Sequence, residues 1–385
     1  MAITFDQIKE RFHAEQKARA NMPLVRREDL PLNYESITPQ WLNAVLAHKS
    51  PGAAVVSHTL GPPDEGTSSR RIISLDWNEA GRNAGLPQRI FCKGTLSLES
   101  RYLLGMNEGV QAEVNFYNLV RPGLNIIAPE SLFARYDPVS LNSIIILNDM
   151  TGEVEFGRID MELTLANAKS QMRQLANMHG RYYRSPELNT TLKPFSTWER
   201  FFTVTAEDAG FADACVRGFK QAEAVIPLRL FQREPEVWPA TLKCVARHHD
   251  LPRTFIHSDV HLKNWYITPN GEMGVNDWQC CSKGNWSRDV AYCISTALVP
   301  EKRRAWEREL LGHYLDCLAA AGGERIAFED AWILYRQQLF AALAWWTGTL
   351  GQPPDAPLMQ PAPTSMEFIR RMAAAIDDLE ALDSF

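Results

Sequence analysis

Residues 257–279, HSDVHLKNWYITPNGEMGVNDWQ, concentrate side chains that could bind a metal or move a proton. Four residues separate Asp259 from Asn264. A β-hairpin is predicted between Asn264 and Asp277. Because a hairpin brings the far ends of its strands together, Asn264 and Asp277 are expected to be neighbours, with Asp259 close by. An amide oxygen and a carboxylate suit a hard cation such as magnesium. A further carboxylate could accept a proton from a hydroxyl group, which completes the components of a phosphoryl-transfer site.

The histidines of the same stretch allow a different hypothesis. His257, Asp259 and His261 alternate along the chain, so a strand would present all three side chains on one face. A transition metal held there would make the protein a metal-dependent hydrolase. This hypothesis gives no role to Asn264 or Asp277.

The elements that must position these residues change in type along the chain. Residues 1–50 have the pattern of polar helices and loops and are expected to form an N-terminal helical extension, with Thr38 as the N-cap of a helix that begins at Pro39. Residues 51–150 favour a small antiparallel β-rich domain, and residues 151–385 favour a large, mostly helical domain. The predicted fold class is therefore α+β.

Short runs rich in Val, Ile and Phe predict the strands of the β-rich domain. These runs are AAVVSHTL, RRIISLDW, RIFCKGTL and SIIILNDM, and a helix is expected over about 110–120, ended by Arg121 and Pro122. In the helical domain, WYIT and MGVN are the expected strands of the hairpin. Pro269-Asn270-Gly271-Glu272 is its expected turn, for which Asn-Gly suits a type I′ geometry.

Composition limits the classes of function. The formal net charge of −6 gives no electrostatic footprint for nucleic acid. No apolar run is long enough to span a bilayer, and the charged first residues lack the apolar core of a signal peptide. Seven cysteines include no C-x-x-C pair. We expect a cytoplasmic protein that binds a small molecule, with neither a nucleic acid nor a membrane as partner.

The order of these residues resembles a known superfamily. HSDVHLKN keeps the His, Asp and Asn spacing of the protein-kinase motif H-R-D-L-x-x-x-N, and Asp277-Trp278-Gln279 stands where D-F-G would follow. The version without D-F-G is similar to the aminoglycoside phosphotransferase and choline kinase superfamily, whose members read H-G-D-x-x-x-x-N. Within it, the D-W-Q ending, RDVAY and LANMHGRYY resemble the ecdysteroid-kinase-like group and its bacterial relatives. The resemblance covers residues from about 55 to 345.

This resemblance implies a protein-kinase-like, two-lobed fold and an ATP-dependent transfer of phosphate to a hydroxyl of a small molecule. It implies that Asp259 is the catalytic base and that Asn264 and Asp277 hold Mg²⁺. His257 would brace the loop, and Asp289 in RDVAY would have a structural role. The sequence departs from the family pattern at Ser258, where Gly is usual, and a position that needs a positive φ would make this change costly.

The upstream half would then supply the nucleotide site. Lys93 lies in a β-like apolar run, where its charge needs a partner. The kinase-like fold offers a phosphate and a helix glutamate as partners, and Glu113 is the first candidate, with Glu108 as the alternative.

The remaining nucleotide contacts are expected at two further segments. The polar turn at Thr67, Ser68 and Ser69 could cradle phosphates with its backbone N–H groups. The backbone around Asn148 and Met150 would face adenine. A kinase fold that has lost activity and only binds its ligand is a third hypothesis, against which the presence of Lys93 and the acidic residues counts.

Overall fold

The computed structural model describes residues 3–105, 108–207, 210–353 and 359–385. The chain divides into two compact units. One comprises Met1–Pro122 and Pro129–Thr151, and the other comprises Gly123–Ala128 and Gly152–Phe385. The separation of residues 1–50 as an extension remains a proposal.

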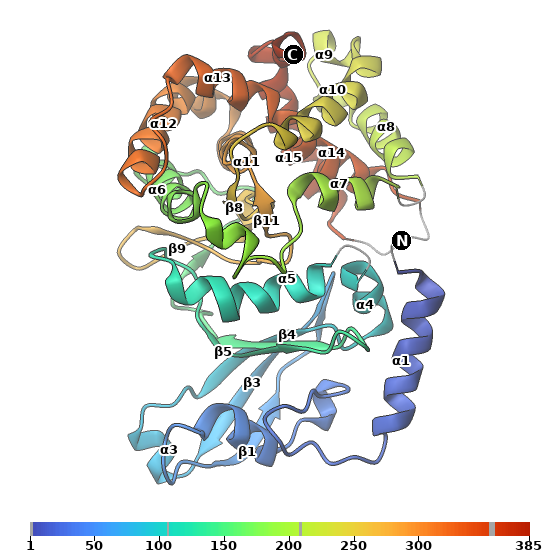
Figure 1. Ribbon diagram of the computed structural model, residues 1–385, viewed down its shortest axis with the longest axis vertical. Helices are drawn as coiled ribbons and strands as arrows, with labels where there is room; N and C mark the ends of the chain where they lie inside the picture. The colour runs from blue at the N-terminus through green and yellow to red at the C-terminus, as the bar shows by residue number, and fades with distance from the viewer. Residues whose placement is uncertain (1–2, 106–107, 208–209, 354–358) are drawn as a thin grey trace. The chain divides into compact units, whose positions relative to one another are not determined.

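The first unit is built on an antiparallel sheet with the strand order β1-β3-β4-β6-β5, and β2 pairs with β3 at its side (Figure 1). All three β-like runs before residue 100 and the SIIILNDM run form strands as predicted. The pattern missed β5 because this strand, with a register shift between Ser131 and Phe133, buries only Phe133 fully. The strands are β1 (Val55–Leu60), β2 (Asp64–Glu65), β3 (Ser69–Trp77), β4 (Arg89–Gly94), β5 (Ser131–Tyr136) and β6 (Ser143–Asn148).

The two faces of this sheet have different partners. Ile90 and Cys92 of β4 point into a core made with residues 24–47, in which Trp41 is fully buried. Alternate residues of a strand face opposite sides. Lys93 therefore points to the other face, along which α5 (Gly109–Asn115) runs in Figure 1.

The helices of the first unit follow from local signals. Thr38 caps the helix that begins at Pro39, as predicted, because its hydroxyl accepts from the backbone N–H of Trp41 at 3.1 Å. The predicted helix at 110–120 is α5 followed by a wider turn over Phe116–Val120. The other helices are α1 (Phe5–Arg19), α2 (Pro39–Leu42), α3 (Glu79–Asn83) and α4 (Leu98–Gly105).

The second unit is mainly helical and surrounds a buried central helix. In α11 (Ser287–Ala297) every residue is buried, so this helix can hold polar side chains away from water. The α+β fold class is confirmed. The other helices of this unit are α6 (Leu165–Tyr182), α7 (Trp198–Glu207), α8 (Phe211–Gln221), α9 (Leu228–Phe231), α10 (Glu234–Ala246), α12 (Pro300–Ala320), α13 (Phe328–Gln337), α14 (Leu339–Leu350) and α15 (Ala362–Asp378).

Short strands interrupt the helices of the second unit. One small sheet has the order β10-β9-β7, and β8 pairs with β11 in another. Their bounds are β7 (Glu155–Phe156), β8 (Thr254–Ile256), β9 (Trp265–Ile267), β10 (Met273–Val275) and β11 (Ser282–Gly284).

The hairpin β9–β10 forms as predicted, but the predicted turn type is wrong. The backbone N–H of Gly271 donates to the carbonyl of Thr268 at 2.9 Å, and Gly271 alone in this turn has a positive φ, of 83°. A type I′ turn over Pro269–Glu272 needs a positive φ at both central residues, Asn270 and Gly271, and Asn270 does not have one. The connection is therefore a type I turn followed by a left-handed glycine.

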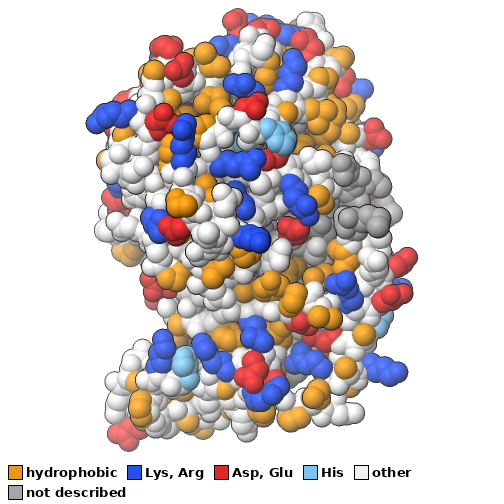
Figure 2. All heavy atoms as spheres, in the orientation of Figure 1, with side chains coloured by type: hydrophobic (Ala, Val, Ile, Leu, Met, Phe, Trp, Pro, Cys, Tyr) orange, Lys and Arg blue, Asp and Glu red, His pale blue; other side chains and the backbone are white. Residues whose placement is uncertain are grey.

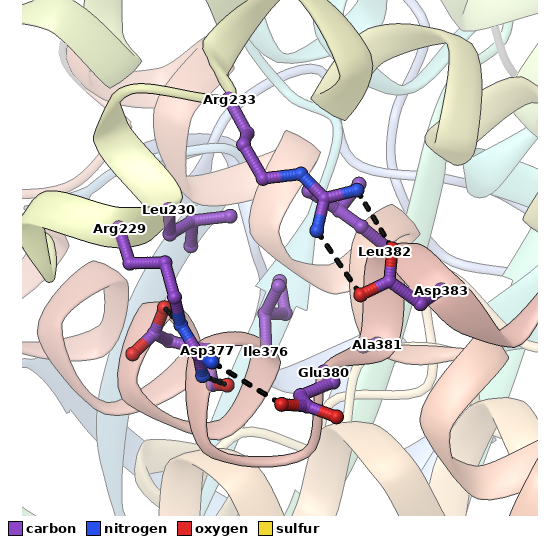
Figure 3. A pocket seen from close by; sticks show the side chains of 9 residues that line it. All are labelled: Arg229, Leu230, Arg233, Ile376, Asp377, Glu380, Ala381, Leu382 and Asp383. Atoms are coloured by element: carbon purple, nitrogen blue, oxygen red, sulfur yellow. Dashed lines mark hydrogen bonds and ion pairs between the residues drawn. The ribbon is translucent and has the colours of Figure 1, made fainter.

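The end of the chain is held by exposed ion pairs. Figure 3 shows Arg229 directed at Asp377 and Glu380, and Arg233 directed at Asp383. Because each arginine has a carboxylate partner, the small pocket that these side chains line offers no uncompensated positive charge. We interpret these ion pairs as structural contacts.

The surface carries charges of both signs. On the face shown in Figure 2, Lys and Arg side chains are interspersed with Asp and Glu. Among the residues that the structure describes, no helix is both long and apolar enough to cross a membrane.

Candidate active site

The loop that carries Asp259 follows β8 and is fixed by Asp289 of the buried helix α11. The Asp289 carboxylate accepts the backbone N–H of His257 at 2.7 Å and that of Ser258 at 2.8 Å. A third contact, at 3.2 Å, comes from Nε2 of His179 in α6. Burial alone would raise the pKa of Asp289, but the His179 contact and the loop N–H groups lower it below its usual range. Asp289 thus holds an ionised carboxylate under the loop.

Ser258 adopts a left-handed backbone conformation, with φ of 69°. This is the conformation for which the usual glycine is suited. The peptide is held on both sides, because its N–H donates to Asp289 and its carbonyl accepts from Arg288 at 3.1 Å. The Ser258 hydroxyl also bonds that of Ser282 at 2.9 Å. Its surroundings therefore fix a backbone conformation that serine alone would disfavour.

Donors surround the carboxylate of Asp259. Tyr292 donates its hydroxyl to Oδ1 at 3.1 Å, and Asn264 donates its Nδ2–H to Oδ2 at 3.2 Å and to the Asp259 carbonyl at 2.8 Å. Nε2 of His261 lies 3.6 Å from Oδ2. Burial raises the pKa of Asp259, but His261, His257 and Tyr292 outweigh it and bring this pKa to about 2. The carboxylate, about 20% exposed, is ionised at neutral pH.

The hairpin brings Asn264 next to the Asp277 segment, as expected. Val275 pairs with Trp265, and the backbone N–H of Asn276 donates to the carbonyl of Asn264 at 2.9 Å. Asp277 follows directly, with φ of 63°. Because the Asn264 amide group donates its N–H to Asp259, its oxygen is the atom available to a cation. A carboxylate and an amide oxygen at neighbouring positions match the hard ligands that Mg²⁺ prefers.

His257 supports the loop through both ring nitrogens. Nδ1 accepts the backbone N–H of Asp259 at 3.2 Å, and Nε2 donates to the carbonyl of Asn276 at 2.9 Å. Burial lowers the pKa of His257, in keeping with this neutral tautomer. A ring with both nitrogens engaged cannot bind a metal. Within the described part of the chain, no group of three or more His, Cys, Asp or Glu residues is arranged to hold a metal ion.

In the first unit, Lys93 and Glu113 form a buried ion pair. Lys93 Nζ lies 2.8 Å from Glu113 Oε2, and both side chains are less than a tenth exposed. Glu108, the alternative partner, precedes α5 in a left-handed conformation. A buried ammonium paired with a helix carboxylate is the arrangement that the kinase-like interpretation requires of Lys93 and Glu113.

The other predicted nucleotide residues lie at strand ends of the same unit. Thr67 and Ser68 lie in the turn from β2 into β3, and Ser69 is the first residue of β3. Among the residues that the structure describes, the buried Ser68 hydroxyl has no hydrogen-bond partner. Asn148 is exposed at the end of β6 and is paired with Ile90, and Met150 follows it half-buried. Their roles stay predictions.

Sequence reasoning missed three side chains that organise this loop. His179 and Arg288 hold Asp289 and Ser258, and Tyr292 holds Asp259. All three lie in segments that carried the family resemblance: His179 in LANMHGRYY, and Arg288 and Tyr292 in RDVAY. Their contacts join residues that are 30 or more positions apart, and no local pattern predicts them.

Comparison with known proteins gives this arrangement a context. Residues 149–332 match the model of the APH family, described as a phosphotransferase enzyme family. The predicted superfamily resemblance is confirmed. The matched segment contains the whole loop, the hairpin and Asp289. The narrower likeness to the ecdysteroid-kinase-like group stays a prediction, and no curated protein sequence matches the chain.

Solved structures agree on the fold. A protein of Ralstonia eutropha JMP134, provisionally assigned as an aminoglycoside phosphotransferase, is 14% identical with a TM-score of 0.51, over 89% of this chain and 97% of that one. An ethanolamine kinase of Plasmodium vivax is 11% identical with a TM-score of 0.50, over 97% of this chain and 98% of that one. The predicted kinase-like fold is thus confirmed.

Proposed function

We propose that this protein is a phosphotransferase that moves the γ-phosphate of ATP onto a hydroxyl of a small molecule. The observation that carries the proposal is the ionised Asp259 carboxylate, held by donors next to the Asn264–Asp277 hairpin within the segment that matches a phosphotransferase family. These are the components that phosphoryl transfer requires.

Asp259 accepts a hydrogen bond from the acceptor hydroxyl and so orients its oxygen toward phosphorus. As that oxygen forms the new P–O bond, the bond between the γ-phosphorus and the bridging oxygen breaks, ADP leaves, and the hydroxyl proton passes to Asp259. Because a carboxylate with a pKa of about 2 is a weak base, orientation contributes more than early proton removal.

Asn264 and Asp277 hold Mg²⁺ in this proposal, with Asn264 turned so that its amide oxygen is the ligand. The bound cation would offset negative charge on the phosphates. His257 and Asp289 keep the loop in place, His257 through its neutral ring and Asp289 through the two loop N–H groups.

Lys93 binds the α- and β-phosphates and is oriented by Glu113. Thr67, Ser68 and Ser69 contribute backbone N–H groups to phosphate binding, and the unpartnered Ser68 hydroxyl supports this role. The backbone at Asn148 and Met150 contacts adenine.

The acceptor is proposed to be a partly apolar alcohol, by the predicted likeness to the ecdysteroid-kinase-like group. A cytoplasmic location is proposed because the seven cysteines are free thiols, the state that a reducing compartment maintains. The hydrolase hypothesis requires His257 as a metal ligand, and its engaged nitrogens argue against that role.

The test is transfer of label from [γ-³²P]ATP in the presence of Mg²⁺, with alcohols, choline, ethanolamine and aminoglycosides as separate acceptors. We expect one class to accept phosphate and Asp259→Asn to lower kcat by about 10²–10⁴-fold, with the KM for ATP nearly unchanged. Wild-type turnover in Asp259→Asn would overturn the assignment of Asp259. ATP binding without transfer to any acceptor or to water would favour the inactive binding protein.

A further inference from the structure

Asp259 is linked to a residue 87 positions later through a chain of two hydrogen bonds. Nε1 of Trp346 in α14 lies 2.8 Å from the Tyr292 hydroxyl, which lies 3.1 Å from Oδ1 of Asp259. Tyr292 and Trp346 are each less than 5% exposed. All three residues belong to the second unit, so the chain is internal to one compact body.

The chemistry of the donors gives this chain one direction. An indole N–H can only donate, so the Tyr292 oxygen must accept from Trp346. The Tyr292 proton is then directed at the carboxylate, which can only accept when ionised. Burial and the neighbouring Asp259 raise the pKa of Tyr292 well above its usual value, so the phenol keeps the proton it donates.

Packing fixes both aromatic rings. The centroid of the Trp346 ring lies 4.5 Å from that of Phe368 in α15 and 5.2 Å from that of His261. The Arg288 guanidinium lies over the Tyr292 ring at 4.6 Å. A hydroxyl held this way has little freedom to rotate, so it fixes one oxygen of Asp259 while Asn264 contacts the other.

We propose that Tyr292 is a positioning residue for the catalytic Asp259 and that Trp346 orients the Tyr292 hydroxyl. This inference rests on the proposed function, because it assigns the two side chains a role in the same phosphoryl transfer. Tyr292 fixes the carboxylate in the orientation that receives the acceptor hydroxyl. Neither residue is proposed to contact a substrate.

The expected kinetic effect is on kcat. Tyr292→Phe keeps the ring and removes only the donor to a charged group, so kcat should fall about 10- to 100-fold while the KM for ATP changes less than twofold. Trp346→Phe keeps an aromatic ring against Phe368 and removes the indole donor. It should lower kcat by a smaller factor, and it should add nothing in the Tyr292→Phe background, because it acts through Tyr292.

Tyr335→Phe is the matched control. Tyr335 is fully buried and donates to Glu307 at 3.1 Å, the same distance as the Tyr292–Asp259 bond, but it plays no part in the loop. Its loss should cost stability and leave kcat within twofold of the wild type.

The experiment measures kcat and KM for Mg·ATP in the full-length protein as ADP release with water in place of the acceptor. The set comprises wild type, the three variants above, the Tyr292→Phe/Trp346→Phe double variant and Asp259→Asn. In parallel, ¹⁵N-tryptophan labelling follows the indole N–H signal of Trp346, assigned by its disappearance in Trp346→Phe. Asp259→Asn should shift this signal, and the shift should vanish in a Tyr292→Phe background.

The outcomes separate the inference from the function on which it rests. Wild-type kcat in Tyr292→Phe, with Asp259→Asn inactive, would overturn the inference and leave the proposed function standing. Additive losses in the double variant would overturn the role of Trp346. Full activity in Asp259→Asn would overturn the catalytic role of Asp259, whereas no release of ADP by the wild type would overturn the proposed function. In either case the indole signal would decide whether Tyr292 holds the Asp259 side chain. Should Tyr292→Phe not fold, an unchanged kcat in Trp346→Phe would refute the proposal.

Discussion

Asp289→Ala should destabilise the second unit strongly, because it leaves two buried backbone N–H groups without a hydrogen-bond acceptor. The carboxylate is fully buried and accepts the N–H groups of His257 and Ser258. A buried donor left without a partner costs about 1–3 kcal/mol, so two such donors cost about 2–6 kcal/mol. Loss of the His179 contact adds little to this cost. The His179 ring can carry its proton on Nδ1 instead and donate it to the Tyr314 hydroxyl, which lies 2.8 Å from Nδ1. Removing a buried charge offsets part of this cost, so we expect Asp289→Ala to lower the free energy of unfolding by about 3 kcal/mol.

Urea unfolding followed by tryptophan fluorescence measures this loss. Nine of the eleven tryptophans lie in Gly152–Phe385, so the signal reports mainly on the second unit. Asp137→Ala is the matched control, because Asp137 accepts the N–H groups of Val139 and Ser140 in a turn that water can reach. Far-UV circular dichroism, which also sees the first unit, should give about 1 kcal/mol or less for this control. Equal losses for Asp289→Ala and Asp137→Ala would refute the reasoning, since burial would then have no effect.

Two further predictions follow from the same loop and its surroundings. In a Ser282→Ala background, Ser258→Gly should stabilise the protein by about 1 kcal/mol, because there it only relieves the positive φ. In the wild-type background the same change should destabilise the protein, because it leaves the Ser282 hydroxyl without its partner. Urea unfolding of the wild type, the two single variants and the double variant checks this, and a stabilising effect in both backgrounds would contradict it. Burial lowers the pKa of His248 from 6.5 to about 4, so stability is full above pH 6.5 and falls by about 3 kcal/mol as pH drops to 4, because the unfolded chain binds a proton there and the folded chain does not. His248→Gln should flatten the slope of unfolding free energy between these pH values, and an unchanged slope would remove His248 as its source.

Local signals predicted much of the fold and the centre of the site. The hairpin between Asn264 and Asp277 is encoded by a few adjacent residues, so their proximity followed from the sequence. The turn type did not, because Asn-Gly favours a type I′ turn centred on Asn270 and Gly271, whereas the turn that forms runs from Thr268 to Gly271 with Pro269 as its first central residue. Lys93 stood out as a lone charge in an apolar strand, and the alternation of β4 then carries it to the face with Glu113.

What the sequence could not provide is the set of long-range contacts that fix the loop. Asp289 was assigned a structural role by resemblance. That it accepts hydrogen bonds from the backbone N–H groups of His257 and Ser258 depends on how α11 packs against the loop. The link between Tyr292 and Trp346 likewise joins two helices that no periodicity pairs. A strand such as β5, with a single fully buried side chain, gives too weak a pattern to detect.

The measurement that tests the central claim most directly is thermal unfolding with ATP and Mg²⁺, repeated with EDTA and with Asp277→Asn. At about 100 times its Kd, a ligand adds about 2.7 kcal/mol to stability. Asp316→Asn, an exposed carboxylate in α12, is the control. The account predicts a rise in Tm that needs both ATP and Mg²⁺, is kept in Asp316→Asn and is lost in Asp277→Asn. A rise that survives EDTA and Asp277→Asn, or a rise produced by Zn²⁺ alone with none from ATP, would contradict it.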